Sequence, residues 1–188
     1  MIGLSRDTVQ VVPYQSCWAQ LFLQEADRLR LALGSVIGRI EHIGSTSVPG
    51  MNAKPIIDML AAVEKLSSAG IVIPALERLG YEHCRDNPVP GRLFFVLGPQ
   101  TGRTHYLSLA EAGSAFWCDH MAFRDYLLTH PAAANDYLVL KQRLAARFAH
   151  DRASYTAAKN DFITNVLSSP DCNAWPRSGT KGVNGREI

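Results

Sequence analysis

The stretch of residues 42–60, HIGSTSVPGMNAKPIIDML, constrains the fold of this chain more than any other part of it. An apolar segment ends at Gly44, a polar turn follows, and a second apolar segment then carries one carboxylate, Asp58. Short apolar segments bounded by turn residues are typical of strands. The pattern therefore predicts two core strands, residues 39–43 and 55–63, joined by a loop of about a dozen residues, a length at which loops are often functional.

The residues of this loop are suited to binding phosphate. Gly44 permits backbone angles and a close approach that a side chain forbids. Ser45, Thr46 and Ser47 supply hydroxyls and N–H groups, a concave set of donors of the kind that holds phosphate. A carboxylate in an apolar strand is costly to bury unless a metal, a donor or an open cleft compensates its charge. Asp58 is therefore the candidate metal ligand and catalytic residue.

The spacing within this stretch also resembles a known pattern. An apolar residue followed by Gly-Ser, twelve further residues and an aspartate is similar to the fingerprint of the nucleotidyltransferase superfamily, and HIGSTSVPG…KPIIDML resembles the GrpB-like family within it. The later segments THYLSL and WCDHMAFRDYLLTHP extend the resemblance to about residues 11–167. The resemblance implies a nucleotidyltransferase-like fold, with a nucleoside triphosphate and Mg²⁺ held near Asp58.

The sequence departs from the superfamily pattern at one position. That pattern places two carboxylates on alternate residues of the second strand, so that both face the same side and hold Mg²⁺ ions. The residue two places after Asp58 is Leu60. One carboxylate can still bind Mg²⁺ together with phosphate oxygens and water. Glu41 and Glu111, at predicted strand ends, are the candidates for a second carboxylate near Asp58.

Composition and length indicate one globular domain. The chain has 188 residues, of which 47% are hydrophobic and 19% charged, which is typical of a single domain with a real core. We expect an α/β (α+β) fold with a nucleotidyltransferase-like mixed, mostly antiparallel sheet of about five strands, flanking helices and a C-terminal helical cap. The domain is predicted to span residues 1–168. Residues 169–188 are poor in apolar side chains and are predicted to be a disordered tail.

Turn signals and hydrophobic periodicity divide the rest of the chain. Apolar residues at helical spacing predict helices over residues 16–33 and 67–79, which we expect on one side of the sheet. Short strands separated by strong turn signals favour an antiparallel meander, and they are expected at residues 81–85, 92–97 and 104–109. The remaining predicted elements are a short edge strand at residues 9–12 and three cap helices at residues 114–129, 132–150 and 154–167.

Each predicted cap helix carries a basic residue on its apolar side. These residues are Arg124, Lys141 and Lys159. Such a side chain extends to the rim of the core, pairs with a carboxylate, or points into a cleft. The aspartates available for structural ion pairs are Asp125, Asp136 and Asp161. If the side chains point into a cleft, they and Lys54 together neutralise the charge of a triphosphate.

Two histidines and one serine have both a structural and a chemical interpretation. His105 begins a predicted strand and is either a hydrogen-bonded structural histidine or, if that strand borders Asp58, a phosphate ligand or general acid/base. His42 precedes Gly44 by two residues and is expected to face the same side, and a hydrogen bond within the sheet edge explains it equally well. Ser45 lacks the G-x-S-x-G turn of a serine nucleophile, and no His-Asp pair can be assigned to it. Serine-based hydrolysis is therefore not favoured.

The remaining composition excludes several classes of site. A net charge of +2 gives no indication of a nucleic-acid or membrane surface. The 4 cysteines are scattered without a C-x-x-C pair, which favours free thiols in a reducing compartment over a disulfide framework or a zinc site. No apolar run approaches the roughly 20 residues of a membrane span, and the first ten residues lack a signal-peptide core. We therefore expect a cytoplasmic protein.

Two functions fit these observations. The first is Mg²⁺-dependent transfer of a nucleotidyl group from a nucleoside triphosphate to an unidentified acceptor. Asp58 would hold the metal, and the loop and the basic side chains would hold the phosphates. The second is a non-catalytic nucleotide- or phosphometabolite-binding protein of the same fold, which Leu60 favours. A third hypothesis is another phosphoryl reaction, such as hydrolysis, that uses His105.

Overall fold

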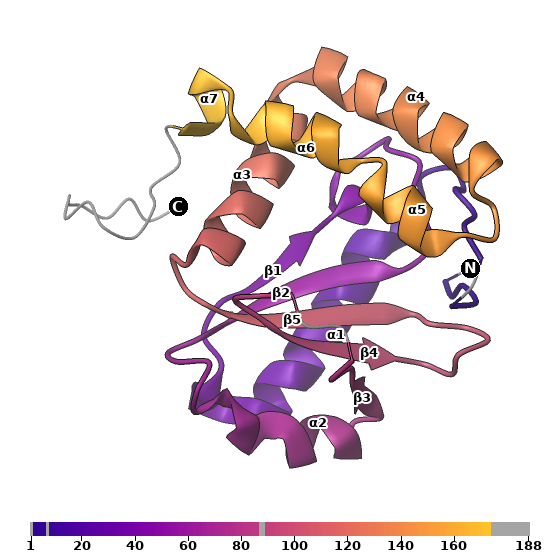
Figure 1. Ribbon diagram of the computed structural model, residues 1–188. Helices are drawn as coiled ribbons and strands as arrows, with labels where there is room; N and C mark the ends of the chain where they lie inside the picture. Colours follow the sequence, from indigo (N-terminus) through magenta and orange to yellow (C-terminus); the bar gives the residue numbers. More distant parts are fainter. Residues whose placement is uncertain (1, 7, 87–88, 174–188) are drawn as a thin grey trace.

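A single five-stranded sheet lies at the centre of the computed structural model, which describes residues 2–6, 8–86 and 89–173 (Figure 1). The strand order is β1-β2-β5-β4-β3. Only β2 and β5 are parallel, and the other neighbouring strands are antiparallel. The strands are β1 (Ile40–Ile43), β2 (Ile57–Val63), β3 (Tyr81–His83), β4 (Leu93–Leu97) and β5 (His105–Glu111). The predicted mixed, mostly antiparallel sheet of five strands is confirmed.

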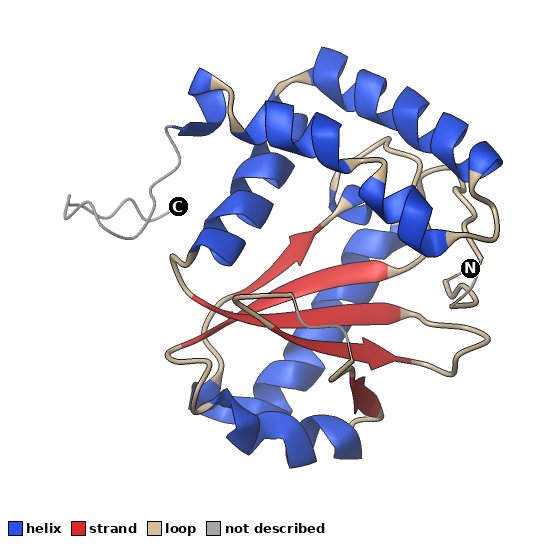
Figure 2. Cartoon of the chain, in the orientation of Figure 1, coloured by secondary structure: helices blue, strands red, loops and turns tan. Residues whose placement is uncertain are grey.

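Helices cover both faces of the sheet (Figure 2). The face on one side packs against α1 (Cys17–Leu33) and α2 (Ile73–Arg78). The helices that follow β5 lie on the other side and form the predicted C-terminal cap. They are α3 (Ala115–Thr129), α4 (Pro131–Arg147), α5 (Arg152–Ala157), α6 (Asn160–Leu167) and α7 (Pro170–Asn173).

The alternation of side chains along β2 divides the core into two layers. Met59 packs with Trp18 and Leu29 of α1 in the larger cluster. Leu60, the next residue, packs instead with Trp117 of α3 in a second cluster. Successive side chains of a strand point to opposite faces. Asp58 therefore shares the cap-side face with Leu60, two residues further along.

Three predicted elements differ in detail. Residues 9–12 form no strand, and Val12 makes only an isolated bridge with Ala53. The predicted helix over residues 67–79 begins as the 3-10 turn η3 (Ala69–Val72), and α2 starts where a proline occupies its first turn, which fits the fixed backbone angle of that residue. The predicted helix over residues 154–167 is two helices, α5 and α6, with Lys159 at the break.

The predicted tail from residue 169 is wrong for its first residues. Residues Pro170–Asn173 form α7, because Cys172 is buried against Ala122 and Val166 and so gives this segment an apolar anchor. Residues 174–188 of that prediction lie outside the described residues. No helix among the described residues is long and apolar enough to cross a membrane.

Two leucines of α1 test which side of this helix faces the sheet. Leu29 is 0% exposed in the core, whereas Leu31 is 89% exposed. We expect Leu29→Ala to lower the free energy of unfolding by about 2–5 kcal/mol, since it leaves a cavity. Leu31→Ala has the same helix propensity change and should stay within about 0.5 kcal/mol of the parent. Urea denaturation measures both, and equal losses would contradict the packing of α1.

Candidate functional site

A cavity of about 1300 Å³ opens between the cap-side face of the sheet and the C-terminal helices. Its walls come from the loop after β1, from β2, β4 and β5, and from α3, α4 and α5. The residues at its centre are Gly44, Ser45, Lys54, Asp58, Lys141 and Lys159. The cleft thus lies where the sequence predicts it, at the meeting of the Gly44-Ser45 turn with Asp58.

Gly44 packs directly on the carboxylate of Asp58. Its backbone has φ 69° and ψ −172°, a conformation used essentially by glycine alone. A Cβ atom on Gly44 would lie 2.7 Å from Asp58 Oδ2 and 3.1 Å from Asp58 Cβ. Glycine is therefore required at position 44 for two reasons: the backbone angles of the turn and the close contact with Asp58.

Lys141 connects the cap to this turn. It is 2% exposed, and its Nζ donates hydrogen bonds to Ser45 Oγ (2.8 Å) and to the carbonyl oxygen of Asn52 (2.6 Å). The ammonium group also lies 5.0 Å from the ring centroid of Tyr137. Burial lowers the pKa of Lys141 to about 7, and the charge of Lys159 nearby contributes in the same direction. The prediction that this lysine points into the cleft agrees with its position.

Lys54 and Lys159 lie against one aromatic ring. Their ammonium groups are 5.4 Å and 4.6 Å from the ring centroid of Tyr155. Burial lowers the pKa of Lys54 to about 7 and that of Lys159 to about 8. Neither lysine forms an ion pair within the described part of the chain. Cation–π contacts of this kind stabilise an ammonium only in part.

Asp58 is the nearby carboxylate that these lysines share. Burial raises its pKa, and the charges of Lys54, Lys159 and Arg152 act in the opposite direction. No cation lies within ion-pair distance of its oxygens among the described residues. Asp58 is thus surrounded by positive charge without being paired, which leaves both it and the lysines available to a ligand.

The sequence analysis did not single out Arg92 and Arg152, which are among the arginines that line the cavity. Arg152 donates to Tyr106 Oη (2.5 Å) and to the carbonyl oxygen of Arg6 (3.1 Å), so it joins α5 to the sheet. Arg92 lies over the ring of Phe94 at the β4 side. Period-two alternation along residues 92–96 would have placed Arg92 on the face of Phe94. For Arg152, at the start of a short helix, no sequence signal marks the role.

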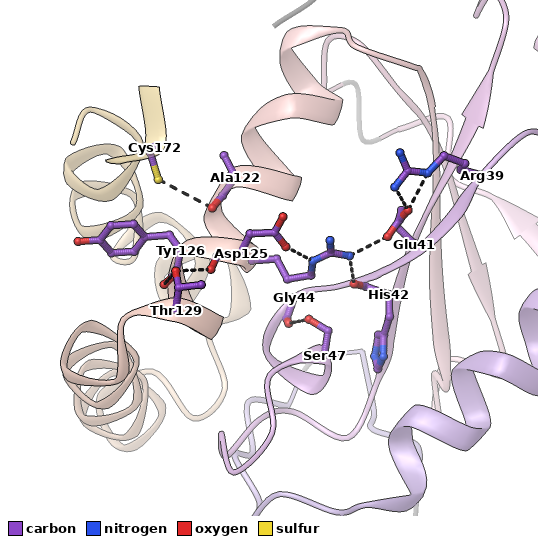
Figure 3. Close-up of polar contacts among 11 residues, drawn as sticks. Arg39, Glu41, His42, Gly44, Ser47, Ala122, Asp125, Tyr126, Thr129 and Cys172 are labelled. Atoms are coloured by element: carbon purple, nitrogen blue, oxygen red, sulfur yellow. Dashed lines mark hydrogen bonds and ion pairs between the residues drawn. The ribbon is translucent and has the colours of Figure 1, made fainter. Parts of the chain in front are cut away.

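Arg124 is not part of the cavity wall. Its guanidinium forms ion pairs with Glu41 (2.8 Å) and Asp125 (2.7 Å) and donates to the carbonyl oxygen of His42 (3.1 Å). Figure 3 labels these three partners. A buried arginine is satisfied by such a set of acceptors. The prediction of Arg124 as a phosphate ligand is therefore replaced by the other interpretation, a structural ion pair.

The hydroxyls beyond Ser45 support the turn itself. Ser47 Oγ donates to the carbonyl oxygen of Gly44 at 2.6 Å (Figure 3). Thr46 Oγ1 is hydrogen-bonded to His42 Nε2 at 2.9 Å and is buried. Ser45 is thus the hydroxyl of the three that directly meets a cavity lysine. The predicted phosphate-binding role of Thr46 and Ser47 is better described as shaping the turn.

The register of the sheet places His105 away from Asp58. His105 lies opposite Ile57 in the β2–β5 pair, whereas Asp58 lies opposite Tyr106. Since neighbours in register share a face, His105 points to the α1 side, where its Nδ1 is hydrogen-bonded to Thr104 Oγ1 (3.0 Å). The prediction of a catalytic His105 beside Asp58 is wrong for this reason.

The side chain of His42 also points to the α1 side. It lies opposite Met59 in register and stacks on Phe22 with ring centroids 4.8 Å apart. Its structural interpretation therefore holds.

Neither glutamate supplies a second carboxylate. Glu41 is engaged by Arg39 and Arg124, and Glu111 accepts a hydrogen bond from the backbone N–H of Leu66 at the far end of β5. Leu60 itself is 0% exposed beneath α3. The position at which the superfamily pattern has its second carboxylate is thus covered by α3.

The comparisons with known proteins agree on one family. The model of the GrpB protein family matches residues 8–169. YqkA of Bacillus subtilis is 36% identical over 94% of this chain, and the chain spans 50% of the length of YqkA. The glutamate-rich protein GrpB of Alkalihalophilus pseudofirmus is 32% identical over 89% of this chain and 99% of that protein.

Solved structures extend the comparison. The conserved protein GrpB from Enterococcus faecalis superimposes with a TM-score of 0.77 at 36% identity, over 84% of this chain and 94% of that chain. The Cid1 poly(U) polymerase bound to MgATP gives a TM-score of 0.51 at 14% identity, over 73% of this chain and 45% of that chain, which is a likeness of fold.

A more distant sequence relative is a dephospho-CoA kinase of Mycolicibacterium paratuberculosis, which is 26% identical over 95% of this chain and 49% of the kinase.

Two glycines of the same loop test the contact with Asp58. Gly44 and Gly50 both have positive φ, but a Cβ on Gly50 would meet nothing within 4 Å. We expect Gly50→Ala to lower the free energy of unfolding by about 1 kcal/mol through backbone strain alone. Gly44→Ala adds the clash with Asp58 and should cost roughly 3 kcal/mol or more. Chemical denaturation measures both, and equal losses would speak against a close contact at Gly44.

Proposed function

This chain belongs to the GrpB family, and we propose that its cavity binds a nucleoside triphosphate or another phosphorylated small molecule. The observation that carries the proposal is the imbalance of charge around Asp58. Lys141 is buried and Lys54 and Lys159 are partly buried around it, all three with lowered pKa values, and Arg152 adds a further positive charge. Buried charges are costly unless they are paired. A bound polyphosphate would supply the missing negative charge.

The proposed contacts follow from the positions of the donors. Ser45 Oγ and Lys141 Nζ are already 2.8 Å apart and would both approach one phosphate group. Lys54 and Lys159, which both lie against the Tyr155 ring, would contact neighbouring phosphates of the ligand. Gly44 would let the backbone approach the same group closely. Hydrogen bonds between ammonium groups and phosphate are stronger than neutral ones, and several together favour a polyphosphate over a single phosphate.

Mg²⁺ fits this site only together with the phosphate. The described residues contain no group of three His, Cys, Asp or Glu side chains that could hold a metal ion. Asp58 would provide one carboxylate ligand, and phosphate oxygens and water would complete the coordination, as Mg²⁺ commonly allows. When bound, the metal would neutralise charge on the phosphates. Asp58 would orient it toward the Gly44 turn.

The more distant comparisons support the chemical class. The poly(U) polymerase of similar fold was solved with MgATP, and the mycobacterial relative is named as a kinase. Both names concern nucleoside phosphates. Because the first protein is similar in fold alone and the second exceeds this chain in length, they support a class of ligand and not a reaction.

Nucleotidyl transfer to an acceptor is the second candidate, favoured by the likeness of fold to a polymerase. Two-metal transfer requires ions about 3.5–4 Å apart, held by shared carboxylates. Leu60 is buried and Glu41 is paired with Arg124. Asp58 is thus left as a single carboxylate where two-metal transfer needs a pair, and the geometry supports binding better than transfer. Release of pyrophosphate from a nucleoside triphosphate with Mg²⁺, lost in Asp58→Asn, would instead favour transfer.

Calorimetric titration of ATP, GTP, CTP and UTP, each with and without Mg²⁺, tests the binding proposal. We expect at least one to bind, and Lys159→Met to weaken that binding about tenfold or more, since it removes a charged hydrogen-bond donor. Lys65 is exposed outside the cavity, so Lys65→Met is the matched control and should change nothing. Asp58→Asn should remove the enhancement by Mg²⁺.

One result would overturn the proposal: neither the nucleotides nor inorganic tripolyphosphate binds to the folded protein. Binding that is unaffected by Lys159→Met would place the ligand elsewhere on the molecule. In either case the charge of the cavity would need another explanation.

The pKa values predict the pH dependence of binding. In the free protein the lysines lose their protons at about pH 7–8, and a bound anion raises those pKa values. The complex therefore takes up protons, and affinity should fall as the pH rises from about 7.5 to 9.5, where the phosphates themselves no longer titrate. Calorimetry at pH 8.5 in two buffers of different ionisation enthalpy measures the uptake. Zero uptake would contradict the lowered pKa values.

A further inference from the structure

The cavity extends beyond Asp58 over a part of the sheet that the cap helices leave open. Trp117 and Met121 of α3 cover the cap-side face at Leu60 and Ala110. Phe94 of β4, on the same face, lines the cavity instead. Figure 2 shows the cap helices gathered over the β1 and β2 side, and none of the described helices lies in front of β4 in this view. The cavity therefore has two halves, one beneath the cap and an open half above β4, which is bordered by residues 82–86 and, near Arg92, by Phe116 of α3.

The register of the strands gives the separation of the two halves. Asp58 lies opposite Tyr106, Tyr106 opposite Val96, and Val96 opposite Glu82, so these residues form one row across the sheet. Neighbouring strands are about 4.8 Å apart, which places Val96 about 10 Å from Asp58. A group above Val96 is thus outside the first coordination sphere of Asp58 but within the length of one small molecule.

The open half contains an arginine, Arg92, that the charge of Asp58 attracts from elsewhere in the cavity. The guanidinium of Arg92 lies 4.1 Å from the ring centroid of Phe94 and donates to Ser108 Oγ (3.0 Å). It forms no ion pair within the described ranges. A guanidinium has five N–H donors in a planar fork that matches carboxylate and phosphate. Arg92 is partly buried, so its charge is less screened than that of a surface arginine.

The apolar surface beside Arg92 suits a planar or aliphatic group. Phe94 is partly buried, and its ring meets that of Tyr106 edge-on with centroids 5.4 Å apart. Val96 continues this surface along β4. Glu82, which lies opposite Val96 in register, is paired with Arg103, and the carboxylate whose charge acts on Arg92 is Asp58. Apolar contact and one anchored anionic group together are typical of a small-molecule site.

We propose that the open half of the sheet is a second ligand subsite, in which Phe94 and Val96 contact an aromatic or aliphatic body and Arg92 binds its carboxylate or phosphate. The inference rests on the proposed function, because the phosphate site beneath the cap holds the other ligand. The two ligands would lie side by side over β5, one anchored beneath the cap and the other at Arg92, whose guanidinium donates to Ser108 of that strand. A subsite of this chemistry takes an organic acid or an organic phosphate as the second molecule.

Ligand-observed NMR with benzoate and phenyl phosphate tests the subsite, in the presence of saturating Mg²⁺ and inorganic tripolyphosphate. We expect at least one of them to bind, and benzyl alcohol, which lacks the anionic group, to bind about tenfold more weakly. If phenyl phosphate binds and benzoate does not, the anchor prefers phosphate; the reverse identifies a carboxylate. Failure of both to bind would overturn the inference.

Arg92→Met should weaken the anionic probe about tenfold while the affinity for tripolyphosphate changes by less than about twofold. Phe94→Leu should weaken the probe a few-fold, and Lys65→Met is again the control. Displacement of the probe by tripolyphosphate in the parent protein would mean a single site and would overturn the inference without any variant. An unchanged probe affinity in a folded Arg92→Met protein would do the same.

The two proposals fail in different ways. Binding of tripolyphosphate without binding of either anionic probe would remove the second subsite and leave the proposed function. Binding of a probe that depends on Arg92, without any binding of tripolyphosphate or nucleotide, would keep this subsite as an anion site and remove the phosphate site.

Discussion

The crowding of like charges around Asp58 is the constraint on which the rest of this structure depends. Lys54, Lys141 and Lys159 come from a loop, a helix and the break between two helices, and burial lowers the pKa of each. Such a group of charges opposes folding in the absence of a counter-ion. Two of the ammonium groups lie near the ring of Tyr155, whose face offsets part of that cost. Under the proposed function, an anion would offset the rest, and the ligand-free protein would be the less stable form.

Besides Arg152, the side chains of Lys141 and Arg124 attach the cap to the sheet, and these two connections differ in character. Lys141 bonds to Ser45 and to the carbonyl oxygen of Asn52 inside the cavity, so a ligand there would meet it directly. Arg124 pairs with Glu41 at the edge strand, where the charges are balanced and a ligand has no access. The first connection belongs to the site and the second to the scaffold. This division explains why only one of them lines the cavity.

The sequence predicted the local features of the site well. The turn at Gly44 and the carboxylate of Asp58 lie within one short stretch, so the contact between them depends on adjacent strands alone. The sequence could not show which basic residue of the cap lines the cavity and which forms a structural ion pair. The partners of Arg124 and Lys141 are 83 and 96 residues away along the chain. The prediction for His105 was wrong for another reason. A shift of one residue in register moves a side chain to the opposite face of the sheet, and the sequence of neither strand specifies the register of β5 on β2.

The contact between Lys141 and Ser45 joins positions 96 residues apart, across the parallel pairing of β2 with β5. Contacts between distant parts of a chain form late, since closing a long loop costs entropy before any bond compensates for it. A nascent polypeptide that has emerged only as far as β5 holds the complete sheet but no lysine from α4 or from the α5–α6 break. Under the proposed function, anion affinity would therefore appear only once the last helices have docked, and a ligand would then bind finished molecules in preference to partial ones.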